Sequence, residues 1–187
     1  PNKTLDFGCG VGRIAVNLAA VSSSLLCMDI SPEMLQESKK NCKERGFSNV
    51  SFALSSDRFE GIEESFDFIH CYLVLQHINP RRGYFIISRL LNMLESDGLA
   101  AIQFPIRGPT GKNGVIRKFL KTWVPFSHNL YNLIEGKRFL DPYMETHHYD
   151  LGKIIEIARE RGMNQFSIDG TIDNSGTLGL FLFIKNA

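Results

Sequence analysis

The sequence predicts a doubly wound α/β domain whose mostly parallel sheet ends in an antiparallel hairpin. Short apolar runs alternate with stretches of helical periodicity, which is typical of a parallel sheet covered by helices on both faces. The last two apolar runs have no helix between them, so the strands that they form must pair antiparallel. Glycines follow the first apolar run directly, as they do in nucleotide-binding turns.

The expected strands are short, and helix signals separate the first five. Leu25–Asp29 is a nearly continuous apolar run, as expected for a strand buried on both faces. Ser31 is a suitable N-cap, with Pro32 at the first helical position and Gly46 after the last turn. Asp150 is a similar N-cap for the last helix. We expect strands at Thr4–Phe7, Leu25–Asp29, Val50–Leu54, Phe66–Leu73, Leu99–Phe104, Phe166–Asp169 and Leu178–Ile184, and helices at Arg13–Ala20, 31–45, Pro80–Leu94 and Leu151–Arg161.

One domain, residues 1–187, accommodates these elements, with an insertion at residues 105–149 after the fifth strand. The insertion is too long for an ordinary α/β connection. Apolar side chains at positions 115–124 share one helical face, and we interpret the insertion as a lid or substrate-binding segment. Only Pro1, Asn2 and Lys3 precede the first expected strand, whereas α/β domains of this kind usually carry one or two helices before it. We therefore expect that an N-terminal helix is lacking.

Composition argues against several classes of function. The formal net charge of +1 provides no global basic field, so we expect no nucleic-acid partner. Neither a signal peptide nor an apolar run long enough for a transmembrane segment is present. The cysteines form no CxxC pair and no Cys/His cluster, so we expect no metal site and a reducing, cytoplasmic compartment. These cysteines are Cys9, Cys27, Cys42 and Cys71.

The segment Gly8–Gly12 predicts a turn that binds a nucleotide. Glycines let the backbone turn tightly and approach a ligand closely, with the amides of the following helix nearby. The spacing is GxGxG, which differs from the GxGxxG of dinucleotide-binding domains. Asp29 ends the second strand, and a carboxylate at that position can accept two hydrogen bonds from a ribose diol.

Four segments, in order along the chain, resemble the motifs of class I S-adenosylmethionine-dependent methyltransferases. Residues 5–13, LDFGCGVGR, resemble the family's first motif, L-D-x-G-C-G-x-G. The next three segments are MDISPEML at 28–35, FDFIHCYLVLQHI at 66–78 and LLNMLESDGL at 90–99. The resemblance covers nearly the whole chain. It implies a Rossmann-like methyltransferase fold with a seven-stranded sheet, and methyl transfer from S-adenosyl-L-methionine to an unidentified, small-molecule acceptor, with S-adenosyl-L-homocysteine as the product.

By position, the resemblance implies a cofactor site at the ends of the first four strands. Residues of the first strand and the glycine turn would hold the methionine end: Asp6, Gly8, Cys9, Gly10 and Gly12. Asp29 would bind the ribose hydroxyls, and Ile30 would pack against adenine. Either Ser56 or Asp57 would meet the adenine amine. The backbone of Cys71 would lie beside the methionine moiety.

Methyl transfer from a sulfonium requires alignment and exclusion of water, and it needs a general base only when the acceptor must lose a proton. His77 is the first candidate for this catalytic base, because it follows the fourth strand where the acceptor should approach. His147, His148 and Tyr149, at the end of the insertion, are the next candidates. The alternative for each histidine is a structural or solvated side chain.

Two other functions remain open on the sequence. A nicotinamide-dependent oxidoreductase also uses a glycine turn and an acidic residue after the second strand. The GxGxG spacing, Asp6 just before it and the terminal hairpin argue against this alternative. The sequence provides no comparable argument against the second alternative, a non-catalytic module that binds the cofactor or a partner protein. Turnover with any acceptor distinguishes this module from an enzyme.

The insertion provides the only indication of the acceptor. It interleaves aromatic residues with basic ones, and residues 105–150 hold seven Lys/Arg and four Asp/Glu. This mixture suits a small molecule with an apolar body and an anionic group. The helix-like stretch at 115–124 also fits a peripheral contact with an anionic membrane surface, although a lid packed on the domain explains the same pattern.

Overall fold

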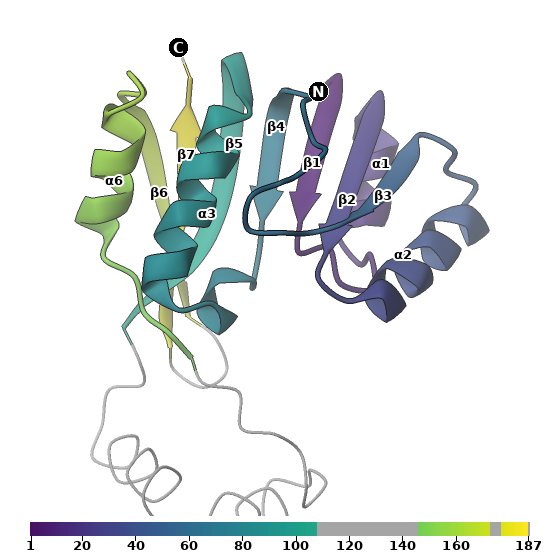
Figure 1. Ribbon diagram of the computed structural model, residues 1–187, viewed down its shortest axis with the longest axis horizontal. Helices are drawn as coiled ribbons and strands as arrows, with labels where there is room; N and C mark the ends of the chain where they lie inside the picture. Colours follow the sequence, from purple (N-terminus) through teal and green to yellow (C-terminus); the bar gives the residue numbers. More distant parts are fainter. Residues whose placement is uncertain (108–145, 173–176, 187) are drawn as a thin grey trace, which may run out of the picture.

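Seven strands form one mixed sheet in the computed structural model, which describes residues 1–107, 146–172 and 177–186 (Figure 1). Its strands are β1 (Lys3–Phe7), β2 (Ser24–Asp29), β3 (Val50–Leu54), β4 (Phe66–Cys71), β5 (Leu94–Arg107), β6 (Gln165–Ile172) and β7 (Leu178–Lys185). Its helices are α1 (Ala15–Val21), α2 (Pro32–Glu44), α3 (Pro80–Asn92) and α6 (Leu151–Arg159), with a short 3₁₀ helix, η1, at Leu75–His77.

The strand order is β3-β2-β1-β4-β5-β7-β6. The first five strands pair in parallel, and β7 is inserted between β5 and β6, antiparallel to both. This order confirms the predicted doubly wound sheet with a terminal hairpin. The carboxyl ends of β1, β2 and β4 therefore meet at one edge of the sheet, where ligands of open α/β folds bind.

Several boundaries differ from the prediction for identifiable reasons. The strand β4 ends at Cys71 because Leu73 adopts a left-handed conformation, with φ of +59°. The strand β5 begins before Leu99, since Leu94 already pairs with β4, and Asp97 (φ +63°) lies in the irregular stretch that follows. It also continues past Phe104, because the antiparallel β7 pairs with it as far as Arg107.

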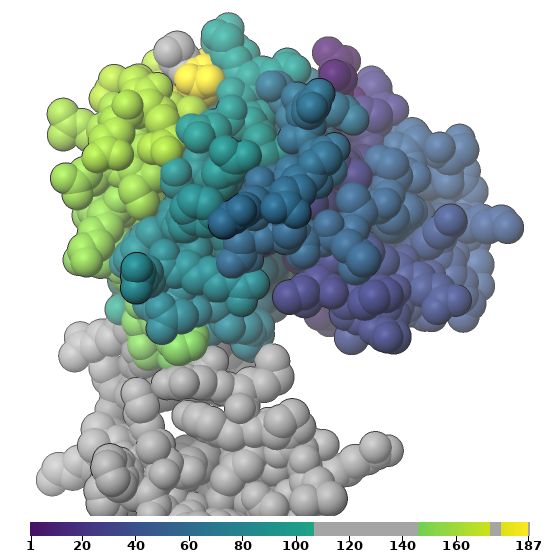
Figure 2. All heavy atoms as spheres, in the orientation of Figure 1, coloured from purple at the N-terminus to yellow at the C-terminus, as the bar shows by residue number. Residues whose placement is uncertain are grey.

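Helices α3 and α6 cover one face of the sheet and enclose the larger core (Figure 1). Together with the blue segment between β3 and β4, they cover this side of the molecule (Figure 2). A smaller apolar cluster lies between α1, α2 and the opposite face at β2 and β3. All four cysteines are free and buried, as expected of small apolar side chains.

On the α1 side, the face of β4 and β7 carries a row of aromatic side chains. Phe68, Phe181 and Phe183 are half-buried there, and Phe181 and Phe183 stack at 5.9 Å between ring centroids. His70 lies on this same face, because it is two residues along β4 from Phe68.

The predicted insertion falls mainly on residues 108–145, outside the described residues, so its interpretation as a lid stays a prediction. Within the described ranges, no helix combines the length and apolar character needed to cross a membrane.

Candidate functional site

The glycine turn lies at the carboxyl edge of β1 and is tied to β2. The amides of Gly8 and Cys9 both donate to the carbonyl of Met28, at 2.7 and 3.0 Å. These bonds continue the β1–β2 pairing into the turn, so the ends of the two strands hold the turn in place.

The three glycines of the turn all have positive φ, but their surroundings differ. A Cβ atom on Gly8 (φ +77°) would clash with a methyl group of Val74, and one on Gly12 (φ +83°) would clash with Oγ of Ser38. A Cβ on Gly10 (φ +53°) would meet nothing within 4 Å. Packing against the protein therefore explains Gly8 and Gly12, whereas Gly10 faces open space.

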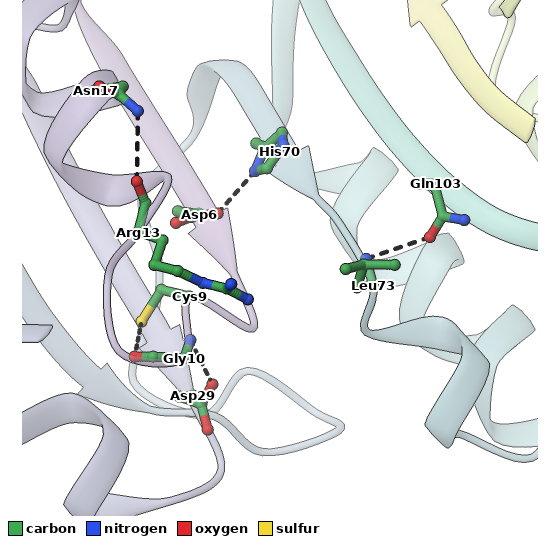
Figure 3. Close-up of polar contacts among 9 residues, drawn as sticks. All are labelled: Asp6, Cys9, Gly10, Arg13, Asn17, Asp29, His70, Leu73 and Gln103. Carbon is green, nitrogen blue, oxygen red and sulfur yellow. Dashed lines mark hydrogen bonds and ion pairs between the residues drawn. The ribbon is translucent and has the colours of Figure 1, made fainter. Parts of the chain in front are cut away.

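The carboxylate of Asp29 holds this turn against the end of β2 (Figure 3). Its Oδ2 accepts from the amide of Gly10 at 2.9 Å, and its Oδ1 accepts from the amide of Ser31 at 3.0 Å. Each oxygen keeps a lone pair for one more donor. The next side chain, Ile30, is 69% exposed although it is apolar. A polar acceptor and an uncovered apolar side chain thus stand together at the edge of the sheet.

Asp6, near the end of β1, is paired with a residue that the sequence analysis did not select. Nδ1 of His70 lies 2.8 Å from Oδ1 of Asp6, and both side chains are buried (Figure 3). The other carboxylate oxygen, Oδ2, is buried and has no hydrogen-bond partner among the described residues. The two residues are neighbours because Asp6 and His70 are register partners in the β1–β4 pairing.

The turn after β4 packs against the glycine turn. Leu73 donates its amide to Oε1 of Gln103 at 3.2 Å, which anchors its left-handed backbone to β5 (Figure 3). Tyr72 stacks on Phe181 with ring centroids 5.4 Å apart and is 38% exposed. Neither Gln103 nor Tyr72 was selected from the sequence, because neither lies in a recognised motif.

Four of the predicted cofactor residues have side chains that contact other parts of the protein. Ser56 accepts the amide of Glu60 at 3.3 Å, and Asp57 forms an ion pair with Arg82. The thiol of Cys9 lies in the smaller core, and that of Cys71 lies in the larger core on the opposite face of the sheet. Burial raises the pKa of Cys71, so its thiol is protonated and inert. Only the backbone of either cysteine is available at the glycine turn.

His77 ends η1, at the carboxyl edge of the sheet. Its Nε2 lies 3.0 Å from the amide nitrogen of the Gln76 side chain, and the backbone amide of His147 donates to the carbonyl of Gln76 at 2.9 Å. Burial, and to a smaller extent His147, lowers the pKa of His77. His77 is therefore neutral at neutral pH and can accept a proton. The adjacent His148 is half-buried.

The side chain of Tyr149, one of the reserve candidates for the base, makes structural contacts. Its hydroxyl donates toward two backbone carbonyls, those of Leu75 at 3.0 Å and Ile78 at 2.7 Å. Burial raises its pKa, so the hydroxyl keeps its proton. Among the residues that the structure describes, no group of three or more His, Cys, Asp or Glu is placed to hold a metal ion.

Residues 4–98, about half of the chain, match the family described as the methyltransferase domain. The chain belongs to this family. The assignment confirms the resemblance that the four motifs carry and removes the basis for the oxidoreductase alternative.

Curated relatives of this methyltransferase domain include two quinone-related enzymes. Ubiquinone biosynthesis O-methyltransferase from Rickettsia conorii is 23% identical over 179 residues, which cover 91% of this chain and 59% of that protein. Demethylmenaquinone methyltransferase from Tropheryma whipplei is 29% identical over 82 residues, or 44% of this chain and 34% of that protein. The matched segments thus span less than two thirds of either relative.

Solved structures with the same fold include two enzymes determined with S-adenosylhomocysteine. Magnesium protoporphyrin IX methyltransferase from Synechocystis PCC 6803 has a TM-score of 0.67 and 19% identity, over 98% of this chain and 74% of that chain. The N-methyltransferase NodS from Bradyrhizobium japonicum WM9 has a TM-score of 0.67 and 16% identity, over 99% and 78%. At these identities the likeness establishes the Rossmann-like fold of the methyltransferase domain.

Proposed function

We propose that this chain binds S-adenosyl-L-methionine at the glycine turn and transfers its methyl group to a small-molecule acceptor. The observation that carries the proposal is the open space beside Gly10, bordered by the Asp29 carboxylate, in a chain of the methyltransferase domain family. An adenosine fits this edge because Asp29 can accept from the ribose hydroxyls while Ile30 packs against the adenine ring.

The methionine end of the cofactor fits the other side of the turn. The unpartnered Oδ2 of Asp6 is a suitable acceptor for an ammonium group, since a buried carboxylate oxygen without a partner is costly. The backbone at Gly8, Cys9, Gly12 and Cys71 completes this part of the proposed site. For the adenine amine, Ser56 and Asp57 remain alternatives.

The methyl transfer requires little of the protein beyond the alignment of the two reactants. When bound, the cofactor supplies a methyl group on a positively charged sulfur. The chain's residues hold the two reactants in line and exclude water, and His77 accepts a proton from an acceptor hydroxyl or amine. Its lowered pKa keeps the imidazole in the neutral form that this step needs.

For the acceptor, we propose a small molecule with an apolar body and an anionic group. Relatives named for ubiquinone, demethylmenaquinone and magnesium protoporphyrin support an apolar acceptor. The aromatic and basic residues at 105–149, the proposed lid of a single domain at 1–187, would contact it. The net charge of +1 argues against a nucleic acid. Four unpaired, buried cysteines support a reducing, cytoplasmic compartment.

The test is calorimetry with S-adenosylmethionine and S-adenosylhomocysteine, each expected to bind with micromolar affinity, about −8 kcal/mol. Asp29→Ala should weaken both ligands equally, by about 1–3 kcal/mol, because both carry the ribose. Glu37→Ala, which removes an exposed carboxylate on α2, is the matched control and should change neither affinity. Unchanged binding by Asp29→Ala would exclude Asp29 from the site.

A further inference from the structure

His70 of β4 and Asp6 of β1 form a buried polar contact across the sheet. Asp6 is 2% exposed and His70 is 9% exposed. A carboxylate accepts and cannot donate, so Nδ1 of His70 carries the proton in the 2.8 Å contact with Oδ1. A charge-assisted bond of this kind fixes the rotamer of both side chains.

The geometry leaves Asp6 half satisfied. Oδ1 is committed to His70, whereas Oδ2 is buried without a partner among the described residues. An oxygen in this state costs free energy unless a donor reaches it. Asp6 lies two residues before the glycine turn at Gly8–Gly12, so a cationic group bound at the turn is a suitable partner for Oδ2.

His70 itself is poorly placed to react with an acceptor. Its ring lies between the rings of Phe68 and Tyr72 on the same face of β4, with centroid distances of 6.5 and 6.3 Å. Its Nδ1 is already engaged by Asp6. These contacts hold the ring in one orientation, which suits a group that orients a neighbour.

We propose that His70 is a positioning residue for the amino-acid end of the cofactor: it holds Asp6 so that Oδ2 receives the ammonium group. The inference rests on the proposed function and adds to it a residue that acts only on the methionine half of the ligand. It therefore predicts an effect that depends on which half of the ligand is present.

The experiment compares two ligands by calorimetry: S-adenosylhomocysteine, which carries the amino acid, and 5′-methylthioadenosine, which has the adenosine and lacks the amino acid. His70→Leu should weaken S-adenosylhomocysteine about 10- to 100-fold and leave 5′-methylthioadenosine within about threefold of wild type. His70→Asn, whose amide nitrogen can replace Nδ1 as the donor, should restore S-adenosylhomocysteine binding to within about threefold.

Phe68→Leu is the matched control, because it alters the same row of rings without touching Asp6; it should change neither affinity. Equal weakening of both ligands by a folded His70→Leu, or no weakening of S-adenosylhomocysteine, would overturn the assignment of His70. A wild-type protein that binds neither ligand would instead overturn the proposed function, and the inference with it.

A second measurement needs no substitution and so does not depend on the variant's stability. Long-range proton–nitrogen NMR correlations of His70 should show the proton on Nδ1 in the unliganded protein. A bare Nδ1 would mean that Asp6 is the donor and carries no charge for an ammonium group, which would overturn the proposal.

Discussion

Among single residues, the three glycines of the turn show how neighbours decide a role. Gly8 and Gly12 are confined by Val74 and by Ser38 of α2, so their missing side chains serve packing within the protein. Gly10 has the same sign of φ, but a Cβ atom there would have no neighbour within 4 Å, so packing within the protein does not explain its missing side chain. One turn thus combines two glycines that packing requires with a third that faces open space.

Alanine substitutions at Gly12 and Gly10 should separate the requirement for packing at Gly12 from the proposed requirement for ligand binding at Gly10. Gly12→Ala should lower the free energy of unfolding by about 2–4 kcal/mol, because a strained φ adds to a clash with Ser38. Gly10→Ala should cost only about 1–2 kcal/mol for the strained φ, yet weaken S-adenosylhomocysteine more than about tenfold. Urea unfolding and calorimetry measure the two effects. Normal binding by Gly10→Ala would show that the turn has been misinterpreted.

Substitution of His77 should lower turnover and leave the affinity for the cofactor nearly unchanged. His77→Ala should lower kcat by about 10²–10⁴-fold and change cofactor dissociation by less than about threefold. Because its pKa is lowered, the imidazole stays neutral below the ordinary value of about 6.5, so activity should fall with acid only below that pH.

The pH dependence of kcat supplies the control for this assignment. His147→Ala removes one of the causes that lower the pKa of His77, so the acid limb should move to higher pH. The limb should disappear in His77→Ala. A stable, fully active His77→Ala variant would mean that the acceptor needs no base, or takes one from the segment at 108–145.

Among the elements, the short link before α6 connects several parts of the fold through Tyr149 and Asp150. Its residue Tyr149 joins η1, α3 and β5: the hydroxyl bonds η1, the ring fills the space over Gly83, and the amide donates to Pro105 at 2.8 Å. Asp150 then caps α6 by accepting from Gly152 at 2.7 Å. This link therefore fixes the position of η1, which carries His77.

Tyr149→Phe should lower the free energy of unfolding by about 1–3 kcal/mol. The substitution removes the hydroxyl that donates to the backbone carbonyls of Leu75 and Ile78, and the contact with Leu75 is buried. Urea denaturation measures the loss. Tyr72→Phe removes a hydroxyl from a half-exposed ring and should change stability by less than about 0.5 kcal/mol. Equal stability of the two variants would contradict the structural role of the Tyr149 hydroxyl.

For the domain as a unit, the sheet order determines which strand ends share an edge. The chain crosses from β3 to β4 so that β4 lies beside β1 rather than beside β3. This crossover brings the turn after β4 against the glycine turn, with Val74 beside Gly8. The proposed site is thus built from two segments that are far apart in the sequence.

Much of the fold could be predicted from local patterns. Ser31 caps α2 by accepting from Met34 at 3.2 Å, Asp150 caps α6, and β3 has the predicted bounds. These features depend on residues within a few positions of one another, where capping and periodicity act. The ends of β5 were predicted less well, because its neighbours in the sheet determine how far it pairs.

The candidate site divides in the same way. The glycine turn and Asp29 were identified from consecutive residues, since a turn and the end of a strand are local features. The contact between Asp6 and His70, which lie 64 positions apart, could not be identified in this way. Neither could the different surroundings of Gly8, Gly10 and Gly12. They depend on strand register and on which side chains pack across the sheet edge, and the folded chain alone specifies these.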